Sequence, residues 1–100
     1  MSAAPLHLVE TAPLKYLIRP CGAVPVNAAP PLLCFLHGYD EAAPLDIFTA
    51  LTRHGPLRAT NPPRCIEPWV IVAPQLPTRG DLWHHYAHVV RQIVLEESQH

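Results

Sequence analysis

Charged residues are scarce in this 100-residue sequence: they make up 15% of it, against roughly a quarter in an average soluble domain. The sequence contains seven Lys and Arg residues and eight Asp and Glu residues, so its formal net charge is -1. The chain therefore lacks the positive excess that a nucleic-acid or anionic-membrane partner requires. No apolar run approaches the roughly 18 residues of a membrane span, and no basic residue precedes an apolar segment near the N-terminus. We expect a cytoplasmic protein with no nucleic-acid and no membrane partner.

Cysteine and serine are also few, which limits the nucleophiles available. Cys21, Cys34 and Cys65 are an odd number without a CxxC pair, so neither a disulfide framework nor a zinc ribbon is expected. Ser2 and Ser98 are the only serines and neither is flanked by glycine, so the sequence contains no G-x-S-x-G nucleophile elbow. A cysteine nucleophile is not expected either, because Cys34 lies in an apolar run and the others lie in proline-rich loops.

Apolar residues (49%) and proline (13 residues) are plentiful, and the prolines divide the chain into short segments. Two short strands are predicted, Leu6–Val9 and Lys15–Ile18, followed by an irregular connection over Arg19–Pro31. Leu32–Leu36 and Trp69–Ala73 are continuous apolar runs, which indicate strands buried on both faces of a parallel sheet. About thirty residues separate these two runs, the length of a crossover between parallel strands.

Two helices complete the predicted α/β arrangement of about four strands. The first spans Pro44–His54, with proline in its first turn and Gly55 and Pro56 as its stop. The second follows Asp81, which can cap it, and has apolar residues at helical spacing through Val94. Its predicted polar face consists of His84, His85, His88, Arg91, Gln92 and Glu96.

Chemistry in such folds lies at the carboxyl ends of the strands, which here are His37–Glu41 and Pro74–Asp81. A glycine directly after a buried strand, as in His37-Gly38-Tyr39, lets the backbone turn and aim an N–H group into a cleft. Such an N–H group can stabilise the negative charge that develops on a carbonyl oxygen. A simple strand-terminating turn is the alternative interpretation of these three residues.

Three motifs carry a resemblance to a known family: PLLCFLHGYDE from Pro31 to Glu41, RHGPL from Arg53 to Leu57, and WVIVAPQLP from Trp69 to Pro77. In this order and spacing the sequence resembles the α/β-hydrolase superfamily, from about Leu14 onward. More narrowly, it is similar to the phospholipase/carboxylesterase and dienelactone-hydrolase-like group of predicted esterases. The resemblance covers only the N-terminal half of that domain, so residues 1–100 would form an incomplete sheet with no second domain.

The resemblance implies a serine hydrolase of carboxylic esters without a cofactor. Gly38 and Tyr39 would form the oxyanion-hole loop, with the Tyr39 N–H as one donor. The nucleophile, the acidic residue and the histidine of the triad would follow in the missing half, so this chain contains no catalytic residue and is predicted to be inactive alone. A small ester would bind only after completion. Trp83 and, less strongly, Gln75 are candidates for the substrate pocket, and His37 is expected to be structural at the loop.

Two alternatives remain from the sequence. The strand Leu32–Leu36 would lie beside the first strand of the absent half, so a non-catalytic remnant or subunit could self-associate or pair with a complementary chain through that exposed edge. His84 and His88 lie one helical turn apart and could share a metal ion. The site lacks H-E-x-x-H order, and no metal site is therefore expected.

Overall fold

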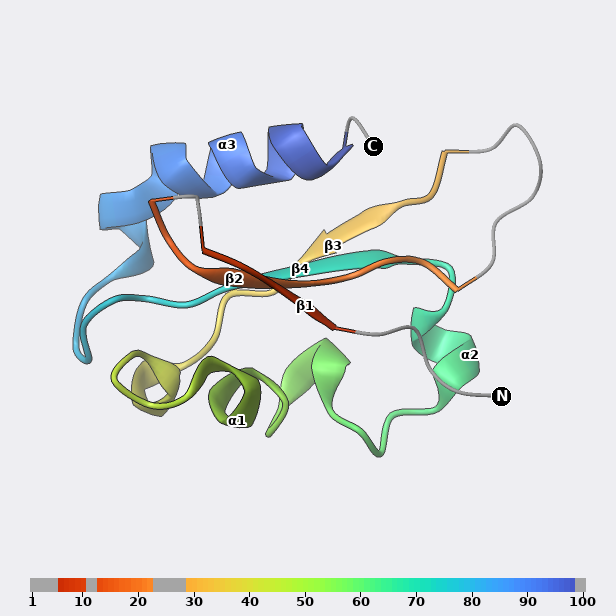
Figure 1. The fold of residues 1–100 in the computed structure, drawn as a ribbon, viewed down its shortest axis with the longest axis horizontal. Coiled ribbons are helices and arrows are strands. Elements are labelled where there is room, and N and C mark those ends of the chain that lie inside the picture. The colour runs from red at the N-terminus through yellow and green to blue at the C-terminus, as the bar shows by residue number, and fades with distance from the viewer. Residues whose placement is uncertain (1–5, 11–12, 23–28, 99–100) are drawn as a thin grey trace.

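The computed structural model describes residues 6–10, 13–22 and 29–98, and its centre is a four-stranded sheet (Figure 1). The strands are β1 (His7–Val9), β2 (Tyr16–Arg19), β3 (Leu32–Cys34) and β4 (Val70–Pro74). Their spatial order is β1-β2-β4-β3. β2 pairs antiparallel with both β1 and β4, whereas β3 and β4 are parallel. The α/β class and the parallel pairing of the two apolar runs are thus confirmed.

Strand β4 owes its central place to its continuous apolar sequence. Ile71, Val72 and Ala73 are fully buried because helices cover both faces of the strand. Ile71 and Ala73 point to the face that carries α1 (Ile47–Leu51) and α2 (Pro63–Ile66), while Val72 points to the face that carries α3 (Ala87–Ser98) (Figure 1). Each large aliphatic side chain buried in this way contributes about 1.5–3 kcal/mol.

Strand β3 is less buried than its apolar sequence predicts. Residues Leu32 to Phe35 are half-buried, and Leu36 is 43% exposed. The physical reason is position: β3 is an edge strand of the described sheet and pairs with β4 on one side only. The prediction that this run is buried on both faces was therefore wrong.

The crossover between β3 and β4 is broken into short pieces, so the predicted helix over 44–54 was too long. The helix proper is α1, only five residues, and its N-cap is Asp46, whose carboxylate accepts hydrogen bonds from the N–H and hydroxyl of Thr49. Pro44 lies outside the helix. Gly55 has a φ of +75° and begins a 3-10 turn, η2 (Gly55–Leu57). The short helix α2 occupies a stretch that the sequence suggested was a loop.

The second predicted helix is present, but it begins differently. A 3-10 turn, η3 (Trp83–Tyr86), leads into α3, and Leu82 rather than Asp81 is the N-cap residue of that turn. The predicted polar face of six residues is exposed along its length, while Ile93 on the opposite side is buried against the sheet. Tyr16 of β2 donates a hydrogen bond of 2.5 Å to Glu97, which joins the far end of α3 to the sheet. No helix in residues 6–10, 13–22 and 29–98 is long and apolar enough to cross a membrane.

Candidate functional site

The carboxyl ends of β3 and β4 lie side by side because the two strands are parallel. His37 joins them: its Nε2 accepts a hydrogen bond of 2.9 Å from the N–H of Leu76. Since Nε2 is the acceptor, the proton of the neutral ring resides on Nδ1, which lies 2.6 Å from the carbonyl oxygen of Gly38. The side chain is 4% exposed. His37 thereby fixes the spacing between the two loops that follow the strands.

Gly38 and Tyr39 form the next step of the first loop. Gly38 is extended, with φ -84° and ψ -172°, and precedes the 3-10 turn η1 (Tyr39–Glu41). This backbone conformation is open to any residue, so the sharp turn that glycine was expected to permit is not what favours it here. A Cβ at this position would instead lie 3.3 Å from Oε1 of Glu41, so close approach is the reason for the small residue.

Glu41, which was not among the predicted site residues, closes the loop on itself. Its Oε1 accepts a hydrogen bond of 3.0 Å from the N–H of Gly38, and its own N–H donates to the Gly38 carbonyl at 3.4 Å. Only 7% of the residue is exposed, and Oε2 has no hydrogen-bond partner among the described residues. The acidic residue three positions after a strand-end glycine is the sequence signal for such a capping box.

The N–H of Tyr39 takes part in none of these hydrogen bonds. The Gly38 and Glu41 N–H groups are both engaged, but no group in the described part of the chain accepts a hydrogen bond from the N–H of Tyr39. As the first residue of a 3-10 turn, Tyr39 has no partner within the turn itself. The loop thus presents the Tyr39 N–H together with that of Asp40, for which no described residue is an acceptor either.

Gln75, a predicted pocket residue, has both amide hydrogens engaged by the backbone. Nε2 donates to the carbonyl oxygens of Glu41 at 3.0 Å and of Leu45 at 2.9 Å, and the residue is 5% exposed. It also lines a cavity of about 620 Å³ between the start of β2 and the segment that leads into α1. Its geometry ties the loop after β3 to the end of β4.

Trp83, the other predicted pocket residue, packs against the same loop. Its Nε1–H donates to the carbonyl oxygen of His37 at 3.1 Å, and the two rings meet edge to face at 5.0 Å. The side chain also packs in the apolar cluster beneath α3. The structure therefore brings four predicted residues together, His37 to Tyr39 and Trp83, and connects Gln75 to them through the backbone of Glu41.

Arg79 contacts two residues on the outer side of the loop. Its guanidinium forms an ion pair with Asp40 at 2.8 Å and lies 5.2 Å from the centre of the Tyr39 ring. The ring is prominent, since Tyr39 is 68% exposed. Gly80 follows with a φ of +89°, which turns the chain back towards η3.

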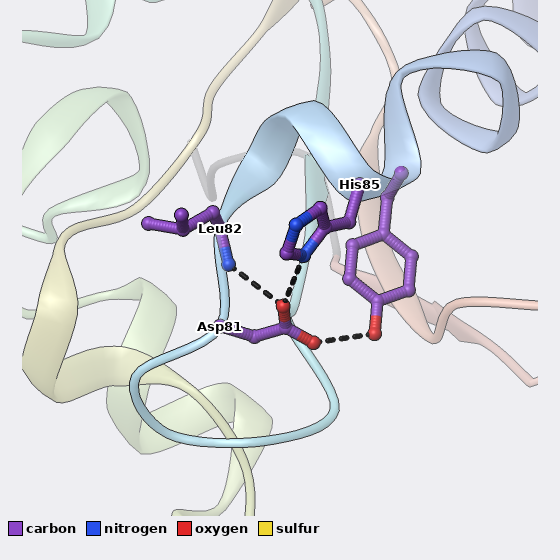
Figure 2. Close-up of polar contacts among 4 residues, drawn as sticks. Asp81, Leu82 and His85 are labelled. Atoms are coloured by element: carbon purple, nitrogen blue, oxygen red, sulfur yellow. Dashed lines mark hydrogen bonds and ion pairs between the residues drawn. The ribbon is translucent and has the colours of Figure 1, made fainter.

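The Asp81 carboxylate contacts three polar groups where the chain enters η3 (Figure 2). It accepts hydrogen bonds from the Tyr86 hydroxyl at 2.6 Å and from the Leu82 N–H at 2.8 Å, and it forms a 2.8 Å contact with Nδ1 of His85. These contacts, that of Tyr86 first, lower the pKa of Asp81 to about 2. The hydrogen bond to Asp81 raises the pKa of Tyr86 in turn. The carboxylate therefore anchors the start of the helix without being its cap.

The histidines of this region do not converge on one point. His85 is engaged with Asp81, and the ring of His84 meets that of His85 edge to face at 4.3 Å. In the part of the chain that the structure describes, no group of three or more His, Cys, Asp and Glu residues could hold a metal ion.

Cys34 and Ser98 are two candidate nucleophiles among the described residues. Burial raises the pKa of the Cys34 thiol, which disfavours the reactive thiolate. Ser98 lies at the end of α3 and donates to the carbonyl oxygen of Leu95. Ser2 lies outside the described residues. Neither the Cys34 nor the Ser98 side chain is therefore activated as a nucleophile.

Comparison with known proteins gives no further guidance: no protein-family model, no curated protein and no solved structure matches this chain.

Proposed function

We propose that this chain forms the oxyanion-hole part of a serine esterase-like α/β hydrolase that cleaves small carboxylic esters. The observation that carries the proposal is the Tyr39 N–H, which lacks a described acceptor while His37, Glu41 and Gln75 hold the loop around it. Preorganised backbone donors are what acyl transfer needs, because they stabilise the charge that develops on the carbonyl oxygen without having to reorient during the reaction.

The sheet is compatible with the resemblance on which this proposal also depends. In the family, the strand that carries the His-Gly loop pairs next with the first strand of the second half. Here β3 lies at the edge of the described sheet, with its free side away from β4. A further strand could pair there and bring a nucleophile elbow to the same end of the sheet as Tyr39.

The remaining machinery must come from other residues. A serine, a general base and an acidic residue are required, and these 100 residues contain no G-x-S-x-G. We therefore expect the chain alone to show no turnover of p-nitrophenyl acetate. The coding sequence downstream of codon 100 should contain an in-frame or frameshifted G-x-S-x-G. Its absence there, or serine-independent hydrolysis by the purified chain, would contradict the proposal.

A single substitution in the completed enzyme tests the role of Tyr39. Tyr39→Pro removes the N–H, and proline is tolerated at the first position of a helical turn. The extended backbone of Gly38 suits the residue before a proline. Loss of one oxyanion donor should lower kcat about 10²- to 10³-fold.

The matched control is Tyr39→Ala, which loses the same ring and its contact with Arg79 but keeps the N–H. It should retain kcat within about tenfold of the wild type, since only the backbone donor is assigned to the transition state. Equal losses in the two variants would show that the side chain, and not the N–H, matters.

The free edge of β3 supports a second candidate, association with a complementary chain or with itself. Leu36, two residues after the end of this strand, is 43% exposed, and an unpaired apolar edge is a template for another strand. We expect size-exclusion chromatography with light scattering to show species larger than a monomer, and Leu36→Lys to reduce them. A monodisperse wild-type monomer would eliminate this candidate.

A further inference from the structure

We propose that Arg53 and Arg79 form a binding site for a carboxylate carried on a short hydrocarbon chain. Both line a cavity of about 510 Å³ together with Asp40, Ala42, Pro44 and Leu45. The cavity opens beside the strand-end loop, because Asp40 directly follows Tyr39 in η1.

The charges of the cavity favour an anion. Arg53 is exposed and forms no ion pair within residues 6–10, 13–22 and 29–98. Arg79 uses one terminal nitrogen on Asp40, in a pair whose side chains are 62% and 69% exposed. An exposed pair of this kind contributes little, and a guanidinium has five N–H donors. Two cations against one carboxylate leave a net positive charge and free donors.

The guanidinium of Arg79 also lies over an aromatic ring. Its central carbon is 5.2 Å from the centre of the Tyr39 ring while one terminal nitrogen contacts Asp40. A planar fork of donors matches the two oxygens of a carboxylate.

The rest of the lining selects the class of ligand. Ala42, Pro44 and Leu45 also line this open cavity and add apolar surface beside the arginines. A carboxylate at the end of a short hydrocarbon chain satisfies both parts, whereas inorganic phosphate would contact the cations alone. If the carbonyl of an ester accepts from the Tyr39 N–H, the acidic end of a half-ester would lie in this cavity; this last step alone rests on the proposed function.

The test is a titration of the 15N-labelled chain, followed by NMR, with monomethyl glutarate, which carries one ester and one carboxylate. We expect saturable shifts of the backbone amides from residue 40 to 45 and of the Nε–H signals of Arg53 and Arg79, with a Kd of about 1 mM. Arg53→Gln should weaken binding about tenfold, because it removes charge-assisted hydrogen bonds. Arg91→Gln, an exposed arginine on the far side of the sheet, is the matched control and should bind as the wild type does.

Two further ligands complete the experiment. Dimethyl glutarate has the same chain without the charge, and inorganic phosphate has charge without the chain; both should bind at least about tenfold more weakly. Binding by Arg53→Gln equal to that of the wild type would overturn the proposal, as would equal binding of the neutral diester or of phosphate. The titration measures binding alone, so its failure would leave the Tyr39→Pro experiment unaffected, and the reverse also holds.

Discussion

Replacing Gln75 by leucine tests whether the strand-end loop is held by the amide beneath it. In the wild type, Nε2 donates to the carbonyl oxygens of Glu41 and Leu45 at 3.0 and 2.9 Å, from a residue that is 5% exposed. Leucine has nearly the same volume, so the substitution removes the two donors without opening a large cavity. The two carbonyl groups would then be left without a described partner.

The expected loss of stability follows from this geometry. A buried acceptor that loses its partner costs about 1–3 kcal/mol. The bond to the Glu41 carbonyl is buried and that to the Leu45 carbonyl is half-buried, so the lower half of this range applies to Leu45 and the sum is about 2–5 kcal/mol. For a domain of this size, such a loss lowers Tm by at least about 8 °C.

Urea unfolding provides the measurement. Trp69 and Trp83 pack on opposite faces of the sheet, so their fluorescence reports on both layers, and far-UV circular dichroism checks that the transitions coincide. The control is Gln92→Leu, the same replacement at an exposed position on α3, which should change stability by less than about 0.5 kcal/mol. If Gln75→Leu costs no more than Gln92→Leu, the loop does not depend on this amide.

Two further perturbations test other parts of the frame. Gly55→Ala should cost at least about 2 kcal/mol, because φ is +75° and the new Cβ would lie 2.7 Å from the Phe35 ring. Gly80→Ala also has a positive φ, but its new Cβ would have no contact closer than 3.9 Å, so only the backbone strain should lower its free energy of unfolding. Equal losses of stability in the two variants would refute the clash at Gly55. Asp81→Asn should destabilise the chain at pH 6, since the lowered pKa of Asp81 means that its stabilisation is present above about pH 4 and is lost as the pH falls towards 2. The difference from the wild type in urea midpoints should therefore shrink at pH 2, and a constant difference would contradict the Asp81 contacts.

The sheet could be predicted well from the sequence, whereas the boundaries of the helices could not. The apolar runs at Leu32 and Trp69 indicate parallel strands, because such strands are buried by crossover helices. The helix over 44–54 was overestimated at both ends: Asp46, a better N-cap than Pro44, fixes its start, and it ends at Leu51, before the expected stop at Gly55. Leu82, the first apolar residue after Asp81, is 53% exposed, because the chain enters α3 through a 3-10 turn.

The sequence predicted the loop residues of the candidate site, but not the contacts that hold this loop in place. His37, Gly38 and Tyr39 follow from their place after a strand. Glu41 is buried because it caps its own loop, and only its spacing from Gly38 distinguishes it from an exposed acid. The roles of Arg79 and Gln75 depend on contacts with residues more than thirty positions away, and a local pattern contains no information on such distances.

The position of β4 in the sheet has a consequence for how the chain folds. β4 comes last of the four strands in sequence, yet it lies between β2 and β3. Its pairing with β2 joins Tyr16 to Pro74, and closing so long a loop carries an entropic cost that slows folding. Until β4 arrives, the hairpin of β1 and β2 and the strand β3 have no common partner. We therefore expect the sheet, and with it the strand-end loops, to form only when β4 pairs between β2 and β3.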